Sequence, residues 1–455
     1  MTLVVIYPIS LKLKSLTMAI LSKEEAKQIL EKVMSFSTAD SLEAGLSGSG
    51  RGNIRYARNT VTTSGFNDDI SLGVTANFGK KSASSTINEF DDESLKKVVK
   101  RAEELAKLAP ENPEFMEPLG PQEYKESKTY FKSTADISPE FRAEIAKNSI
   151  GPAKAKDVTA AGYLEDSSGF SSIMNSKGLF AYSQESELEF TVTMRTNDGT
   201  GSGWVSRDYN DVNLFNGAEA SAVALEKAIM SREAKAIEPG KYTVIMEPAA
   251  SVQLLGNMLY NMGARQADEG RSFLSKKGGG TKIGEKIVDE RVNIYSDPFN
   301  ELVPANGWSG DGLPRERTSW IENGVVKNMS YSRYWAQKQG VEPVPGPANG
   351  IMVGGDATTE DLIKSTKRGI LVTRLWYIRT VDPQTLLYTG LTRDGTFYIE
   401  NGKIKHPIKN MRFNESPIIM LNNLEELGQQ QRINGNLVPV MKIRDFTFTS
   451  LSDAV

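Results

Sequence analysis

The sequence predicts a soluble α+β protein with a mixed helix and meander N-terminal half and a mainly antiparallel β C-terminal half. Up to about residue 235, helix-type patterns alternate with strand-type patterns. Beyond the turn Glu238-Pro239-Gly240, turns and short apolar runs dominate. The chain has 455 residues, of which 39% are hydrophobic and 24% charged, which is enough for two or three cores. We therefore expect two domains, residues 20–235 and 236–455.

The N-terminal half is predicted to contain two helix, meander, helix units. A capping box at Ser22-Lys23-Glu24-Glu25 starts the first helix, and Asp91 opens the helix that closes this unit. The same order recurs about 117 residues later, from Ser138 to about Met230. Each small sheet would bury its apolar face under its own helices or against the other unit. In the first unit the strand patterns cover 54–63, 70–78 and about 82–87, after a Gly-rich stretch at 45–52 and with a connection at 64–69.

The C-terminal half begins with a short strand that turns into a helix predicted over 248–265. Pro248 suits the first helical turn, and Glu247 suits its positive end. Val252, Leu255, Leu259 and Met262 repeat at helical spacing. Asn323-Gly324 and Asn401-Gly402 each lie between apolar runs, which is typical of β-hairpins. We expect a sheet or barrel-like body with this helix packed on it.

Composition excludes several kinds of catalytic site. The chain has no cysteine and one histidine, His406. Disulfides, thiolate zinc sites, iron-sulfur clusters and cysteine nucleophiles are therefore impossible, and a Ser-His-Asp triad would depend wholly on His406. The net charge of −3 gives no global electrostatic reason to expect direct binding of nucleic acid or an anionic membrane.

The first residues are expected to form a disordered extension, residues 1–19. Their apolar run, residues 3–9, is followed rather than preceded by Lys12 and Lys14, which is the wrong polarity for a signal peptide. No apolar run is long enough to span a membrane. We therefore expect a cytoplasmic protein that does not act at a membrane.

Two clusters are candidates for chemistry or binding. Asp311 lies in Trp308–Pro314, where an aromatic, a carboxylate and flexible glycines are concentrated, although a structural turn has the same composition. Arg374, Trp376, Arg379 and Arg393 fall along adjacent predicted strands. They could bind an acidic or C-terminal group of a peptide, or they could be the solvent-facing arginines of an antiparallel sheet.

Several stretches of the sequence follow one another in a specific order and spacing. They are Tyr242–Pro248 with Leu254-Leu255, Asp311-Gly312-Leu313-Pro314 with Ile321–Gly324, Thr366–Thr373, and Thr389–Gly395 with Ile399–Ile404. With these stretches the chain resembles the TldD/PmbA family, also called modulators of DNA gyrase, from about residue 20 to the C-terminus. The resemblance implies a heteromeric protease system that degrades or trims unfolded peptides. In that family the TldD-like subunit carries a zinc-binding HExxxH helix and a later cysteine ligand, and the PmbA-like (TldE) subunit lacks them.

The resemblance places Gly256, Asn257 and Asn261 where the zinc helix has His, Glu and His. It places Gln431 where the later cysteine stands. Amides are poor zinc ligands, and Asn257 cannot act as a general base. The resemblance therefore implies a metal-free, non-catalytic subunit, with zinc expected in a TldD-like partner. Gly256, Asn257, Asn261, Gln431, Asp311 and Arg393 are its candidate peptide-binding residues.

Partners and alternatives follow from the same reasoning. The resemblance implies a heteromer with the zinc-bearing homologue, or a homodimer, that holds an extended peptide. One alternative is a stand-alone hydrolase with a non-zinc mechanism, such as carboxylates including Asp311 with a hard metal. Another is a non-enzymatic interaction protein that acts on DNA gyrase or on a toxin-antitoxin pair, as the family's older name suggests.

Overall fold

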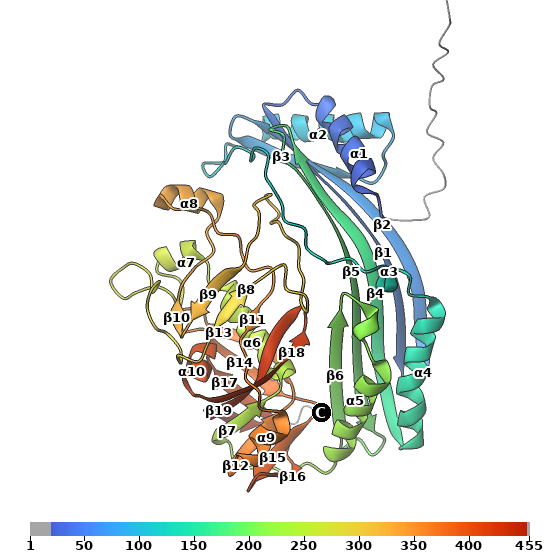
Figure 1. Ribbon diagram of the computed structural model, residues 1–455, viewed down its shortest axis with the longest axis vertical. Coiled ribbons are helices and arrows are strands. Elements are labelled where there is room, and N and C mark those ends of the chain that lie inside the picture. The colour runs from blue at the N-terminus through green and yellow to red at the C-terminus, as the bar shows by residue number, and fades with distance from the viewer. Residues whose placement is uncertain (1–19, 453–455) are drawn as a thin grey trace, which may run out of the picture.

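A six-stranded antiparallel sheet forms the N-terminal part of the computed structural model, which describes residues 20–452. The expected extension, residues 1–19, lies outside the described residues. The two predicted meanders join edge to edge because β1 pairs with β4, so they form one curved sheet rather than two (Figure 1). The sheet order is β3-β2-β1-β4-β5-β6. The strands are β1 (Ser41–Ala57), β2 (Thr60–Phe78), β3 (Lys81–Ile87), β4 (Val158–Asn175), β5 (Phe180–Thr196) and β6 (Ser202–Tyr209).

Helices flank these strands in the repeated order that the sequence predicts. Ser22 forms the expected capping box at the start of α1, and Asp91 caps α2. Apolar side chains of the helices and the strands form two buried clusters, and each cluster also takes residues from the other repeat, Phe170 and Met174 of β4 in one and Ile54 and Tyr56 of β1 in the other. The helices are α1 (Lys23–Ser35), α2 (Asp92–Leu108), α3 (Lys132–Ala135), α4 (Pro139–Ala155), η1 (Val212–Leu214) and α5 (Gly217–Met230).

The strand ends differ from those predicted. The first hairpin turns at Arg58 and Asn59, both with positive φ, so residues 64–69 lie inside β2 and not in a connection. The Gly-rich stretch 45–52, which precedes the first predicted strand, lies inside β1. Gly52 has a packing reason, because a Cβ at this position would lie 1.7 Å from Nη2 of Arg142. Arg142 is buried and pairs with Asp166 on β4.

The C-terminal part is a thirteen-stranded sheet, mainly antiparallel. Parallel pairs occur where β11 meets β19 and where β7 meets β12. The expected mainly antiparallel sheet is present, and the pairings of the described residues follow one path with side branches. The strands are β7 (Gly240–Met246), β8 (Ile294–Ser296), β9 (Thr318–Glu322), β10 (Val325–Val326), β11 (Ile351–Met352), β12 (Arg368–Val372), β13 (Leu375–Asp382), β14 (Leu387–Thr392), β15 (Thr396–Glu400), β16 (Lys403–Pro407), β17 (Met411–Glu415), β18 (Leu424–Ile433) and β19 (Asn436–Leu451).

The predicted helix forms α6 (Pro248–Tyr260) and packs on β18 and β19. It ends at Tyr260 because Asn261 already has C-cap geometry, five residues before the predicted end. Its stripe of Val252, Leu255, Leu259 and Met262 belongs to the main C-terminal core. The short helices are α7 (Ala264–Asp268), α8 (Arg333–Gln339), α9 (Thr359–Lys364) and α10 (Pro417–Asn422). Within residues 20–452, no helix is long and apolar enough to cross a membrane.

Charged contacts join the two parts. Arg265 of α7 makes two hydrogen bonds of 2.8 Å to Glu114, in the segment between α2 and α3. The hairpin of β18 and β19 reaches β6 (Figure 1). There Arg432 of β18 pairs with Asp208 of β6. The Arg432–Asp208 pair therefore holds β18 against β6.

Candidate functional site

One face of α6 lies open, and it is the face that the sequence singles out. Gln253, Gly256 and Tyr260 are exposed, and 87% of the surface of Tyr260 is accessible to solvent. No atom lies within 4 Å of the position that a Cβ on Gly256 would take. The apolar face of the helix is buried in the C-terminal core, so α6 is a packed helix with a free polar side.

Asn257 and Asn261 lie at the end of this open face. The Asn261 side-chain amide donates to the Asn257 carbonyl over 2.8 Å, and its backbone N–H caps the helix. Both side chains are partly exposed. Asn261 therefore terminates α6, which gives it a structural role in addition to its place on the open face.

Gln431 lies on β18, the strand that contacts α6. Its side chain is exposed, and it pairs in register with Val438 of β19. The structure therefore carries Gly256, Asn257, Asn261 and Gln431 on two elements that contact each other.

A row of acidic side chains escaped the sequence prediction. Glu187 and Glu189 alternate on β5 with buried Leu188 and Phe190, so they point to the opposite face of the sheet. Asp208 lies opposite Glu189 in register, on the face that meets β18. The signal was present in the sequence as Glu185-Ser186-Glu187-Leu188-Glu189, where the carboxylates recur with the period of a strand.

The environment of this acidic row favours protonation. Burial raises the pKa of Glu187 to about 7, with further contributions from the charges of Glu189 and Asp208. Burial, followed by the charge of Asp208, also raises the pKa of Glu189. The positive charge of Arg432 lowers the pKa of Glu187 and so opposes part of this increase. The neutral form of Glu187 is therefore favoured more strongly than that of a solvent-exposed glutamate.

Asp311 belongs to another surface. It is exposed on the loop before β9 and accepts a 2.6 Å hydrogen bond from Ser309 Oγ. It lines a cavity whose other walls are β1, β2, β3 and β4, including Glu43. Burial, opposed by Arg333 and reinforced by Asp311, raises the pKa of Glu43. Burial and then Asp311 raise the pKa of Tyr124 to about 12.

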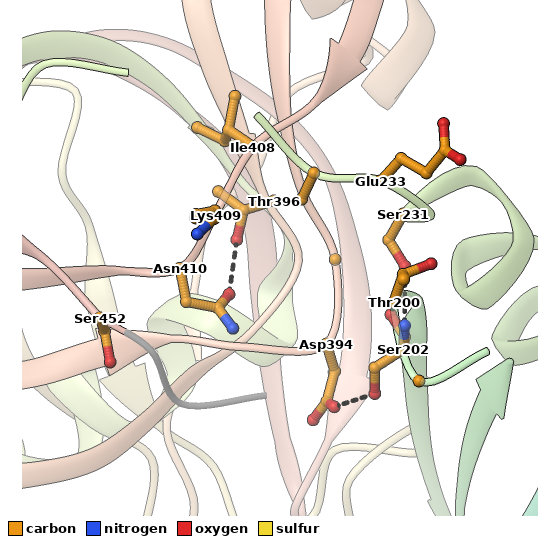
Figure 2. A pocket seen from close by; sticks show the side chains of 13 residues that line it. Thr200, Ser202, Ser231, Glu233, Asp394, Thr396, Ile408, Lys409, Asn410 and Ser452 are labelled. Atoms are coloured by element: carbon orange, nitrogen blue, oxygen red, sulfur yellow. Dashed lines mark hydrogen bonds between the residues drawn. The ribbon is translucent and has the colours of Figure 1, made fainter. Parts of the chain in front are cut away.

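Arg393 lies at the junction of the two sheets. Its guanidinium stacks 4.0 Å from the centre of the Trp376 ring and lies 3.6 Å from Asp394. The buried Asp394 also pairs with Arg374 and accepts a 2.5 Å hydrogen bond from Ser202 of β6. Figure 2 shows Asp394 and Ser202 in the pocket that they share with Ser231 and Thr396. Arg393 and Arg374 therefore balance a buried carboxylate, whereas Arg379 stacks on Tyr377.

Zinc does not fit the residues that the resemblance aligns with the ligands. Gly256 has no side chain, Asn257 and Gln431 offer amides, and the Asn261 amide is committed to the helix end. Within residues 20–452, no three His, Cys, Asp or Glu side chains are grouped so that they could hold a metal ion. The donor set is therefore unsuited to zinc.

Comparisons with known proteins agree with this architecture. Metalloprotease PmbA of Escherichia coli O157:H7 is 21% identical over 94% of this chain and 99% of its own. The structure of TldE from Thermococcus kodakarensis superposes with a TM-score of 0.84 at 19% identity, covering 94% of this chain and 100% of that chain. A structure from Thermotoga maritima, described as a modulator of a DNA gyrase, gives 0.84 at 19% identity and covers 93% of this chain and 100% of that chain.

The fold is that of a metallopeptidase-type protein. Family models match three segments, the PmbA/TldA metallopeptidase domain 1 at residues 43–106, the central domain at 132–234 and the C-terminal domain at 239–450. The chain belongs to the PmbA/TldA metallopeptidase family.

Proposed function

We propose that this chain is the PmbA/TldE-like subunit of a TldD/PmbA-type metalloprotease system that degrades unfolded or small peptides. In this proposal the chain is metal-free and non-catalytic, and its zinc-bearing homologue performs the hydrolysis. The open face of α6 supports the proposal, because the resemblance aligns this helix with the zinc helix, and the aligned positions carry Gly256, Asn257 and Asn261 in place of zinc ligands.

The subunit's contribution would be to complete and shape the peptide-binding surface. The open face of α6 and the exposed Gln431 supply amide donors and acceptors without a charge. Such groups can bind a peptide main chain with little dependence on its side chains. In this proposal the peptide bond is cleaved at the active site of the homologue. Asn257 and Gln431 only bind the peptide.

The test measures hydrolysis of labelled, unfolded casein by four samples. They are this chain alone, this chain with added zinc, the HExxxH homologue alone, and both chains together. We expect no hydrolysis from this chain with or without zinc, and a higher rate from the mixture than from the homologue alone. Hydrolysis by the isolated chain would favour a stand-alone hydrolase, and an unchanged rate in the mixture would reject the subunit role.

A further inference from the structure

A groove lies where the segment between α2 and α3 crosses the loop that joins β8 to β9. Tyr124 of the segment donates a 2.7 Å hydrogen bond from its hydroxyl to the Gly312 carbonyl, and Ser127 Oγ donates one of 2.6 Å to the Pro298 carbonyl. These bonds hold the segment against the loop. The groove between them has a volume of about 730 Å³, which is a size typical of ligand sites.

Arg315 brings an incompletely bonded guanidinium to this groove. Within residues 20–452, its hydrogen bonds both run from Nη1, to the carbonyls of Asn306 and Trp308 over 3.4 and 3.1 Å. Its buried Nε has no partner in this part of the chain. Burial lowers the pKa of Arg315, and Asp311, whose charge opposes this effect, is hydrogen-bonded to Ser309 instead. A buried cation in this state favours an anionic ligand.

The Nε edge of arginine is the edge that binds carboxylates elsewhere in this protein. Arg142 donates from Nε and Nη2 to the two oxygens of Asp166, over 2.5 and 2.8 Å. Arg291 donates from the same two atoms to the two oxygens of Asp289, over 2.7 and 3.0 Å. Both atoms lie on one side of the planar guanidinium, so they form two parallel hydrogen bonds with a carboxylate. The corresponding edge of Arg315 is therefore suited to a carboxylate from outside the chain.

A second unpartnered donor lies close to Arg315. The Trp320 side chain on β9 is 1% exposed, and its indole N–H has no hydrogen-bond partner among the described residues. Trp320 and Arg315 line one small cavity of about 10 Å³, which shares Arg315 and Glu316 with the groove. Two buried N–H donors at one cavity require an acceptor, and this volume corresponds to about one oxygen atom.

We propose that Arg315 and Trp320 bind the terminal carboxylate of a peptide that lies in the groove. The Nε edge of Arg315 donates to both oxygens of this carboxylate, and the oxygen in the small cavity also accepts from the Trp320 indole. The choice of a peptide as the carrier of the carboxylate rests on the proposed function. The site thus adds a preference for one end of the peptide to the binding of its main chain.

The other charges of the groove favour a terminal carboxylate over an acidic side chain. Lys125 and Arg317 are the cations that line it in addition to Arg315. Three carboxylates oppose them, and they would repel an acidic side chain within a bound peptide. A single charge at the end of the peptide can reach Arg315 without this repulsion. The three carboxylates are those of Glu123, Asp297 and Glu316.

The test compares three short peptides that carry a neutral coumarin at the N-terminus. One is hexaalanine with a free carboxylate, the second is its C-terminal amide, and the third is an amide with aspartate next to the last residue. In fluorescence anisotropy with the isolated chain, we expect the free acid to bind at least about tenfold more tightly than either amide. Equal binding of the free acid and the plain amide, or no binding, would mean that water satisfies both donors and would overturn the proposal. Tight binding of the aspartate peptide would overturn the assignment to the terminus.

Variants at Arg315 locate the preference. Arg315→Met should bind the free acid no better than the amide, because both parallel hydrogen bonds are lost. Arg315→Lys keeps the charge without the two-atom edge and should recover only part of the preference. Arg317→Met is the matched control, because Arg317 is exposed on the same groove and stacks on Tyr295, and it should keep the preference. An unchanged preference in a folded Arg315→Met would reject the site.

Trp320→Phe removes the indole donor and leaves Arg315 in place. It should weaken binding of the free acid by about threefold or more while binding of the amide stays the same. Trp308→Phe is the matched control, because the Trp308 N–H is also buried and unpartnered but lines neither cavity. Equal effects of the two variants would reject the role of Trp320. These measurements need neither the homologue nor hydrolysis, so their failure is distinct from failure of the subunit role.

Discussion

Arg432 of β18 donates a 2.9 Å hydrogen bond from Nε to Oδ2 of Asp208 on β6, and the Gly435 N–H donates to the same oxygen over 2.8 Å. The two side chains are 10% and 3% exposed. The other oxygen of Asp208 has no hydrogen-bond partner among the described residues. One ion pair therefore holds the β18–β19 hairpin on the N-terminal sheet.

Replacing Arg432 by methionine should destabilise this contact strongly. The change leaves the buried Asp208 carboxylate with one donor, and breaking such a pair costs about 3–5 kcal/mol. Urea unfolding measures the effect. Gln431→Met, one residue away and exposed, should change the unfolding free energy by no more than about 0.5 kcal/mol. Equal effects of the two variants would contradict the role of the pair.

Glu187→Gln should remove part of the pH dependence of stability. The pKa of Glu187 is raised from 4.5 to about 7 in the folded protein, so ionisation opposes folding. The contribution of neutral Glu187 to the free energy of unfolding is therefore complete below about pH 4.5, and it is lost as the pH rises to about 7. The variant should be more stable than the parent at pH 8 by about 1–2 kcal/mol, after discounting for partial exposure.

Thermal unfolding across this pH range provides the measurement for Glu187. Glu185→Gln is the matched control, because Glu185 lies two residues earlier on the same face and is exposed. It should follow the parental profile closely. Parallel profiles for Glu187→Gln and the parent would show that burial of Glu187 does not oppose its ionisation.

Gly52→Ala should lower the free energy of unfolding of the N-terminal sheet. The added Cβ would lie 1.7 Å from Nη2 of Arg142, whose Nε and Nη2 bond to Asp166 over 2.5 and 2.8 Å. Displacing this buried arginine leaves Asp166 uncompensated, at a cost of about 3–5 kcal/mol. Gly45→Ala on the same strand meets its nearest atoms at 3.9 Å and should cost little. Guanidinium unfolding of both variants would distinguish a specific clash from a general intolerance of β1.

Gly256→Ala should stabilise the isolated chain. Gly256 lies inside α6 with open space around it, and alanine in a helix interior is favoured over glycine by about 0.5–1 kcal/mol. Urea unfolding of the isolated chain provides the measurement. A loss of stability would mean that the face of α6 is covered rather than open.

Local signals predicted the elements that depend on neighbouring residues. The capping box at Ser22 and the reversals at Asn323-Gly324 and Asn401-Gly402 are present, because each is determined within a few residues. The first hairpin was misplaced because Arg58 and Asn59 form its turn with positive φ. The turn contains no glycine, the residue that usually indicates positive φ.

The candidate site was predicted only in part. The position and the polar face of α6 follow from helical periodicity, but the acidic row depends on which strand faces β18. Arg393 was interpreted as a peptide-binding or solvent-facing group because its adjacent Asp394 gave no sign of being buried. Contacts between residues far apart in sequence, such as Ser202 with Asp394, cannot be read from local patterns.

The place of β19 has a consequence for biosynthesis. This strand, Asn436–Leu451, pairs with β7, β11, β17 and β18, so it lies inside the C-terminal sheet although it follows all four of them in the sequence. The N-terminal sheet has all its strands by Tyr209 and can form while the ribosome still holds the remainder. The strands that pair with β19 keep those edges unpaired until β19 is synthesised, and unpaired strand edges favour aggregation.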